Sequence, residues 1–79
     1  MTEHEIKEMI EQGLDCQSVE VTGDGHHFEA VIISELFEQK RLVARQQMVY
    51  ATVNDKIASG ELHALSLKTI TPDEAIASS

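Results

Sequence analysis

The side chains in this sequence best suited to bind a metal are its histidines. His26 and His27 follow a glycine-rich segment, and His63 stands alone in a later apolar stretch. Imidazole is a good ligand for zinc, copper and iron, but a structural metal site needs four ligands. Two of these histidines could supply half of a site and a partner the rest, as in bridging clusters with two histidines on one side. The plain alternatives are exposed loop histidines and a histidine with satisfied hydrogen bonds at a strand end.

Cys16 and His4 are weaker candidates for chemistry. Cys16 could be a nucleophile or a redox thiol, but a lone cysteine before a strand is more often a packing residue. It is the single cysteine of the chain, so an internal disulfide is excluded, which is typical of a reducing compartment. His4 falls in a first helical turn, where a positive charge is unfavourable, and is expected at the surface. The sequence contains no catalytic motif, phosphate loop or paired CxxC spacing, so we do not expect an enzyme.

A predicted β-hairpin would carry His26 and His27. Residues 17–22 alternate as a strand with one wet side, and residues 27–34 predict a second strand that is apolar on both faces and therefore central. Between them, the Gly-Asp-Gly sequence at positions 23–25 predicts a turn, because glycine tolerates positive φ and aspartate favours local hydrogen bonds.

A third predicted strand, at residues 60–69, would carry His63 at its start. Its alternation would place Leu62, Ala64 and Ser66 on one face and His63, Leu65 and Leu67 on the other. The helical segment before it has the length of a crossover, so the second and third strands should be parallel. Parallel strands start at the same edge of a sheet. We therefore expect His27 and His63, as first residues of these strands, to converge on one surface.

Two long helices are predicted to cover the sheet. Residues 2–12 start with a capping box between Thr2 and Glu5. Residues 41–58 carry an apolar wedge, with a glutamine in its middle, formed by Leu42, Gln46, Val49, Val53 and Ile57. The connection before this second helix has an apolar anchor at Leu36 and Phe37. Thr71 and Pro72 start a last, short helix that ends by Ser79. The order α-β-β-α-β predicts one α+β domain, residues 1–79, with helices packed on one face of a three-stranded mixed sheet.

Composition limits the partners and the compartment. The net charge of −8 disfavours nonspecific binding to nucleic acid, although Lys40, Arg41 and Arg45 could form a local basic patch. The polar, acidic N-terminus does not resemble a signal peptide, and no apolar run is long enough to span a membrane. We therefore expect a soluble cytoplasmic protein without a membrane partner. The sequence leaves a weak homodimer open.

Three segments together resemble the BolA-like proteins over nearly the whole chain. They are the string from His27 to Glu38, the string from Leu42 to Thr52, and the closing string from Leu62 to Thr69 followed by Thr71-Pro72-Asp73-Glu74. The Gly23-Asp24-Gly25 loop and the Gln46-Gln47 pair are most similar to the short bacterial IbaG branch.

This resemblance implies a class II KH-like fold and a non-enzymatic role in iron–sulfur trafficking or sensing. It implies a complex with a monothiol glutaredoxin in which a [2Fe-2S] cluster bridges the two proteins and is not bound by this chain alone. The glutaredoxin cysteine and a glutathione thiolate would ligate one side. On the other side the ligands would be His63 and a loop histidine, His27 or alternatively His26. The branch is similar to proteins linked to acid-stress resistance.

The alternative implied by the founding branch of the family is a DNA-binding transcriptional regulator. Three departures bear on this. Many members have Arg-His-Arg where this chain has Arg45-Gln46-Gln47, which removes a basic residue. The GxxG loop of nucleic-acid-binding KH domains is absent, and Ala75 replaces a tryptophan that would anchor the tail.

A third hypothesis is an interaction module that reports acidification, since histidines as a class titrate near pH 6.5.

Overall fold

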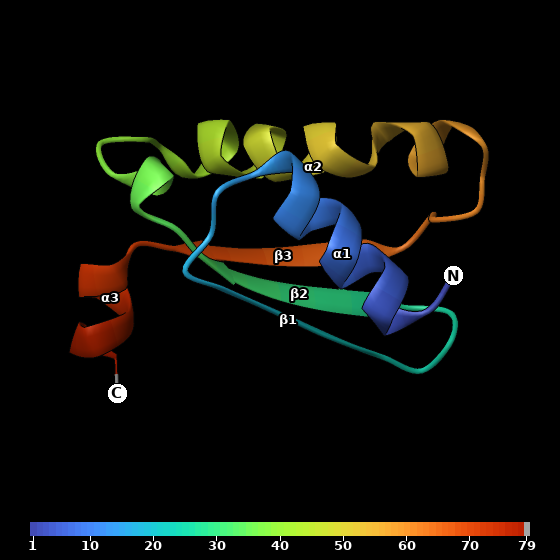
Figure 1. The fold of residues 1–79 in the computed structure, drawn as a ribbon, viewed down its shortest axis with the longest axis horizontal. Coiled ribbons are helices and arrows are strands. Elements are labelled where there is room, and N and C mark those ends of the chain that lie inside the picture. Colours follow the sequence, from blue (N-terminus) through green and yellow to red (C-terminus); the bar gives the residue numbers. More distant parts are fainter. Residues whose placement is uncertain (79) are drawn as a thin grey trace.

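The computed structural model describes residues 1–78 and has a three-stranded sheet with two long helices above it (Figure 1). In chain order the elements are α1 (Glu3–Gly13), β1 (Ser18–Gly23), β2 (Phe28–Ile33), the 3-10 helix η1 (Glu35–Phe37), α2 (Leu42–Ala58), β3 (Leu65–Ile70) and α3 (Pro72–Ala77). Within the sheet, β2 is central, antiparallel to β1 and parallel to β3. The predicted α+β order and the mixed sheet are confirmed. Ser79, which the sequence assigned to the last helix, lies outside the described residues.

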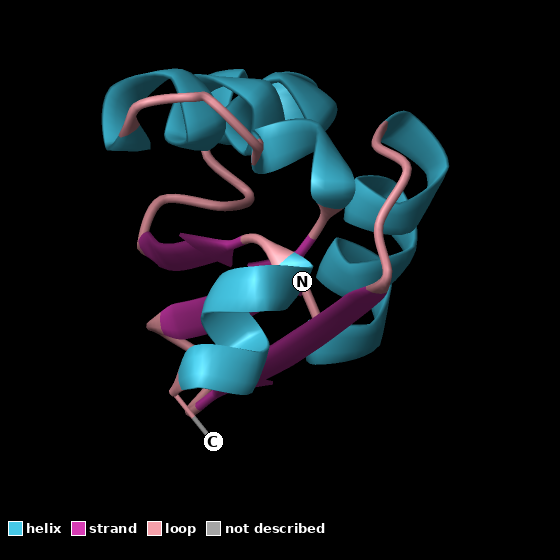
Figure 2. Cartoon of the chain, turned by 90° about the vertical axis from the view of Figure 1, so that its left-hand side faces the viewer, coloured by secondary structure: helices cyan, strands magenta, loops and turns pink. Residues whose placement is uncertain are grey.

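The core lies between one face of the sheet and the layer formed by α1 and α2 (Figure 2). α1 begins as predicted, because the Thr2 hydroxyl accepts from the Glu5 amide and the Glu5 carboxylate accepts from the Thr2 amide. Every layer contributes buried apolar side chains to this core: Ile6, Ile10, Val19, Phe28, Ala30, Ile32, Phe37, Val49, Val53 and Leu62. The alternating burial along β2 follows the period of a strand and turns Phe28, Ala30 and Ile32 to the core, while α1 packs mainly on β1 and α2 on β3.

The prediction for the third strand is wrong at its start. β3 begins at Leu65, and the backbone amide of Leu62 instead donates to the carbonyl of Lys56 at 3.0 Å. Leu62 therefore completes the C-terminus of α2, and the first contact of this segment with β2 is the hydrogen bond from the Phe28 amide to the Ala64 carbonyl. As a result Leu62 is buried while Ser66 is exposed, so these two residues do not share a face.

The predicted wedge on α2 is confirmed in its middle and wrong at its ends. Val49 and Val53 are fully buried, but Leu42 is 60% exposed and Ile57 is 39% exposed. Gln46 is half-buried rather than enclosed, so its amide keeps access to water. The helix is longer than the part of the sheet it covers, and its first turn leaves the core.

The two residues of the predicted anchor before α2 have different roles. Phe37 is fully buried, whereas Leu36 is 46% exposed. The buried Ser34 fixes this turn, because its hydroxyl donates to the Asp15 carbonyl at 2.7 Å and accepts from the Leu36 amide at 3.1 Å. Phe37 is thus the side chain through which η1 closes the core.

Candidate functional site

The starts of β2 and β3 bring the two predicted ligand segments together at one end of the molecule. Phe28 is paired with Leu65, and the Phe28 amide donates to the Ala64 carbonyl at 2.8 Å. His27 directly precedes Phe28, and His63 directly precedes Ala64. The sequence predicted His27 and His63 as the first residues of their strands, and this prediction is wrong, because β2 begins at Phe28 and β3 at Leu65. Both histidines nevertheless flank this hydrogen bond. We call His26, His27 and His63 the histidine rim.

Asp24 fixes the backbone of the loop that carries two of these histidines. Its Oδ1 accepts from the backbone amides of His26 at 2.9 Å and His27 at 2.8 Å, and its own amide donates to the His27 carbonyl at 3.2 Å. Gly25 takes φ of +94°, a conformation that glycine adopts without strain. The backbone amides of His27 and His26 hold the pKa of the Asp24 carboxyl below its ordinary value of 3.8.

Replacing Asp24 with alanine is expected to loosen this loop without unfolding the domain. The carboxylate accepts both amides in its charged form, and its lowered pKa means that this restraint holds above pH 3.8 and is lost as the pH falls through the lowered value. Amide hydrogen exchange at His26 and His27 should become several-fold faster in Asp24→Ala. Asp24→Asn, which keeps an acceptor oxygen, is the matched control. Equal exchange in Asp24→Ala and the wild type would contradict this role.

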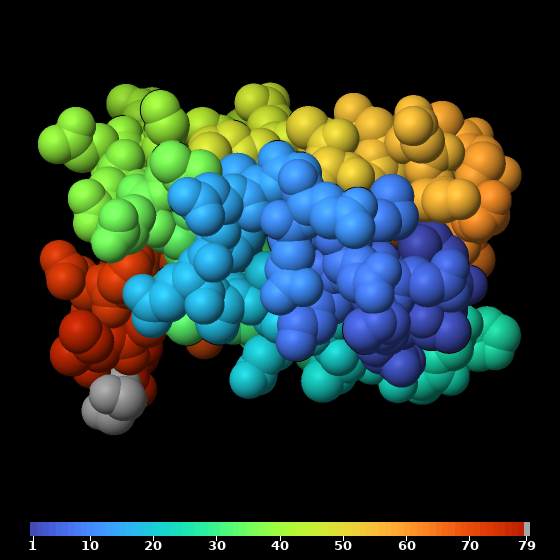
Figure 3. Space-filling model, viewed as in Figure 1, coloured from blue at the N-terminus to red at the C-terminus, as the bar shows by residue number. Residues whose placement is uncertain are grey.

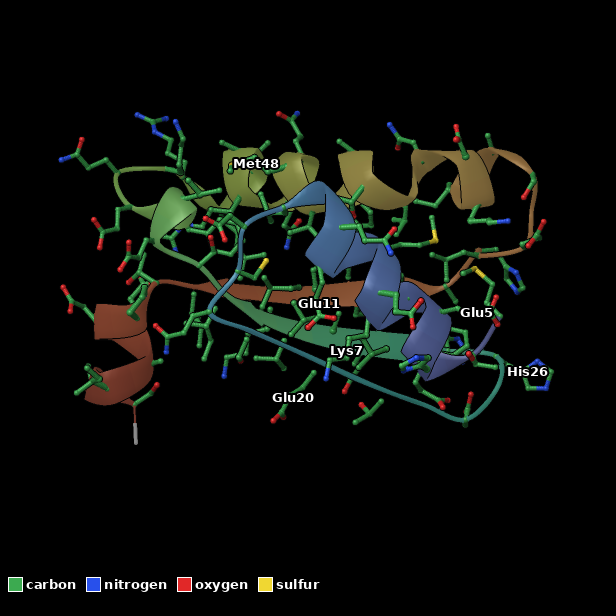
Figure 4. All side chains as sticks on the ribbon, in the orientation of Figure 1. Glu5, Lys7, Glu11, Glu20, His26 and Met48 are labelled. Atoms are coloured by element: carbon green, nitrogen blue, oxygen red, sulfur yellow. The ribbon has the colours of Figure 1, made fainter. Side chains whose placement is uncertain are left out.

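The imidazole rings of the histidine rim are exposed to solvent. Among residues 1–78 the structure gives these three rings no hydrogen-bond or ion-pair partner. His26 projects outward from the end of the β1–β2 loop (Figure 4). His63 lines a shallow hollow of about 170 Å³ together with Tyr50, Ile57, Leu62 and Leu65. Ring nitrogens in this state can accept a metal without first breaking an internal contact.

The donor set of this rim fits a shared metal centre better than a complete one. Within the described part of the chain, no three histidine, cysteine, aspartate or glutamate side chains gather into a group that could hold a metal ion. A metal centre that used His27 and His63 would therefore draw its remaining ligands from another molecule.

Cys16 and His4 lie outside the rim. The Gln17 amide donates to the Ile33 carbonyl at 2.7 Å, which places Cys16 at the opposite end of the sheet. Burial, Asp15 and Glu11 raise the pKa of the half-buried Cys16 thiol, which donates to the Leu14 carbonyl. Because only the thiolate is a good nucleophile, a raised pKa favours the interpretation of Cys16 as a packing residue. His4 is exposed and pairs with Glu8 along α1.

The predicted basic patch is reduced to two residues, because Arg45 is occupied. The Arg45 side chain is only 13% exposed and pairs with both carboxylate oxygens of Glu74, at 2.7 and 3.3 Å. It also donates to the backbone carbonyls of Lys40 and Thr69. Lys40 and Arg41 remain exposed, at the end opposite the histidine rim. They are thus far from any partner that binds only at the histidines.

Arg45 and Glu74 also anchor α3, which the sequence had predicted to be poorly held. No residue of α3 is buried, but Glu74 bonds both to Arg45 and to the Thr71 amide of its own capping box. These bonds hold the pKa of the Glu74 carboxyl below its ordinary value, with Arg45 as the largest cause. The Thr71-x-x-Glu74 spacing signals the cap in the sequence, but nothing in it indicates the arginine.

In the described residues, no helix is both long and apolar enough to cross a membrane.

The comparisons with known proteins agree with one another. The family model for "BolA-like protein" matches residues 3–74. The chain is 39% identical over 74 residues to the acid stress protein IbaG of Escherichia coli K12, which covers 94% of this chain and 88% of that protein. A solved bolA homologue from Coxiella burnetii has 43% identity, covers 96% of this chain and 97% of its own, and superposes with a TM-score of 0.81. The BolA domain of SufE1 from Arabidopsis thaliana has 34% identity, covers 91% and 93%, and gives a TM-score of 0.78.

Proposed function

Because the chain belongs to the BolA-like family, we propose that it is a non-enzymatic partner of a monothiol glutaredoxin, and that the two proteins together hold a bridging [2Fe-2S] cluster. His63 and His27 would be the ligands from this chain, with His26 as the alternative loop ligand. The glutaredoxin cysteine and glutathione would supply the thiolates. Bound in this way, the cluster would provide the iron and sulfide that the protein helps to deliver or to sense.

The observation that carries this proposal is the position of His27 and His63 at the paired starts of β2 and β3. The Phe28–Ala64 hydrogen bond ties together the two segments that carry these histidines. The rings are exposed and have no partner within the described residues, so a second protein could reach them. Iron–sulfur centres with histidine ligands on one iron are chemically established.

Asp24 would serve this function by limiting the freedom of the loop. A ligand on a fixed backbone loses less conformational entropy when it binds. The Asp24 bonds restrain the His26 and His27 backbones and leave their rings free. A role in acid-stress resistance is proposed with this function, from the name of the Escherichia coli relative.

Reconstitution with a monothiol glutaredoxin tests the proposal. An equimolar mixture with glutathione, iron and sulfide should give a coloured heterodimer whose visible circular dichroism differs from that of the glutaredoxin alone. The uncombined chain, treated in the same way, is the control and should remain colourless. A glutaredoxin spectrum that does not change when this chain is added would reject the proposal.

The occupied Arg45 weighs against the alternative of a DNA-binding regulator. Phosphate contacts need free cations, and the pairing of Arg45 with Glu74 leaves only Lys40 and Arg41 of the predicted basic patch, in a chain with a net charge of −8. If the chain did regulate transcription directly, a promoter fragment should shift at low salt, and binding should weaken steeply as salt rises. The proposed function predicts no such shift.

A further inference from the structure

We infer that Tyr50 is a positioning residue of the proposed site, because its hydroxyl fastens the start of β3 to α2 and so fixes the backbone that carries His63. Tyr50 lies on α2, and its hydroxyl donates to the carbonyl of Leu65, the first residue of β3, at 2.9 Å. The inference deepens the proposed function and rests on it. Tyr50 would not bind iron itself, and it would act on the cluster through His63.

The segment that carries His63 is held on both sides of this residue but not at the residue itself. On the helix side, the Leu62 amide donates to the Lys56 carbonyl at 3.0 Å, and on the sheet side the Ala64 carbonyl accepts from the Phe28 amide at 2.8 Å. Within residues 1–78, the structure gives the backbone of His63 no hydrogen bond of its own. The position of His63 therefore depends on how firmly its neighbours are held.

The start of β3 needs support on the side away from β2, because β3 is an edge strand. The Ala64 carbonyl accepts from β2, and successive carbonyls along a strand point to opposite sides, so those of Leu65 and Thr69 face the free edge. Both are nevertheless occupied: Leu65 accepts from Tyr50, and Thr69 accepts from the Arg45 guanidinium at 3.2 Å. α2 thus fastens the free edge of β3 at two points, and Tyr50 provides the one at the histidine end.

The Tyr50 ring is well placed for this task. It is half-buried and packs against the core, so the hydroxyl at its tip is held in place by the ring. Tyr50 and His63 line the same shallow hollow, together with Leu65. Figure 3 shows the segment after α2 (orange) at the same end of the surface as the β1–β2 loop (teal), which carries the other proposed ligand. Among the described residues, Tyr50 is the one side chain that hydrogen-bonds to the backbone of residues 62–65.

Removal of this hydrogen bond should affect the site much more than the fold. A single hydrogen bond changes a local equilibrium by about two- to tenfold, which is enough to change how often the His63 segment leaves its place. Metal ligands must stay within about 0.2 Å of their positions, and residues that orient a ligand from outside the metal's own shell alter metal affinity. A looser start of β3 should therefore shorten the lifetime of a cluster held by His63 and leave the His27 side of the site unchanged.

Tyr50→Phe, which removes the hydroxyl and keeps the ring, tests the inference first in the chain on its own. The amide hydrogens of Leu62 and Phe28 report the two bonds that flank His63, and both should exchange about two- to tenfold faster in the variant. Thr52→Val is the matched control, because the Thr52 hydroxyl also lies on α2 but donates to a carbonyl within the same helix. This control should leave both exchange rates at their wild-type values.

The reconstituted glutaredoxin complex gives a second readout, which a merely structural role would not change. With this chain labelled at its histidines with nitrogen-15, pulsed electron paramagnetic resonance of the reduced Tyr50→Phe complex should show one altered nitrogen coupling. The altered coupling should be the one that His63→Ala removes, and the other should keep its wild-type value. After addition of an iron chelator, the variant should lose its cluster about two- to tenfold faster than the wild type. Thr52→Val should match the wild type in both measurements.

The outcomes separate this inference from the proposed function. If the wild type forms the cluster and Tyr50→Phe has the same nitrogen couplings and the same rate of cluster loss, the inference is wrong and the proposed function stands. This holds even if amide exchange is faster in the variant, because the hydroxyl would then stabilise β3 without positioning a ligand. If the wild type forms no cluster with the glutaredoxin, the proposed function fails and the inference fails with it.

Discussion

His63→Ala is expected to abolish the visible circular dichroism of the reconstituted glutaredoxin complex while leaving the fold intact. His63 is exposed and its ring has no hydrogen bond within the described residues, so its removal should change the free energy of unfolding by less than about 0.5 kcal/mol. If the ring binds iron, its loss removes one of the two ligands that this chain supplies. Reconstitution of the variant, followed by visible circular dichroism, measures the effect.

His4→Ala is the matched control for this experiment. His4 is also an exposed histidine, but it pairs with Glu8 on α1, outside the histidine rim. The control should give the wild-type spectrum. His27→Ala should resemble His63→Ala, and His26→Ala should resemble the control. If His26→Ala is the one that loses the spectrum, the loop ligand is His26. A wild-type spectrum in His63→Ala removes His63 from the proposed site.

Phe37→Ala is expected to lower the free energy of unfolding by about 3–5 kcal/mol. Phe37 is fully buried and is the side chain by which η1 closes the core. Its removal would leave a cavity in a small domain, for which such a loss is a large part of the total stability. Urea denaturation followed by far-ultraviolet circular dichroism gives the difference.

Leu36→Ala, one residue earlier in the same turn, is the control. Leu36 is 46% exposed, so the same kind of truncation should cost less than about 1 kcal/mol. The contrast tests whether η1 is held by Phe37 or by the general hydrophobicity of the pair. If Phe37→Ala and Leu36→Ala lower the free energy of unfolding by similar amounts, the assignment of Phe37 to the core and of Leu36 to the surface is wrong.

Local signals in the sequence were sufficient for the order and direction of the elements. The Thr2–Glu5 capping box starts α1, and the alternation of Phe28, Ala30 and Ile32 gives the buried face of β2. Chain connectivity gave the parallel pairing of β2 with β3, because a helix of 17 residues between two strands is a crossover. This pairing in turn brought the His27 and His63 segments to one end.

Features that depend on contacts distant in sequence could not be predicted. Leu62 has the alternation of a strand residue, but its amide completes the end of α2, so β3 starts three residues later. Leu42 has the spacing of a core residue and lies beyond the covered part of the sheet. Arg45 appeared to belong to a basic patch, because its partner Glu74 is 29 residues away. These contacts are set by packing, which no local pattern records.

The most direct test of the account is pulsed electron paramagnetic resonance of the reduced complex, reconstituted with this chain labelled at its histidines with nitrogen-15. Direct iron ligation predicts strong couplings to two labelled imidazole nitrogens, one of which disappears in His63→Ala. A reduced cluster that shows no strong coupling to labelled nitrogen would contradict the claim that the histidine rim supplies its ligands.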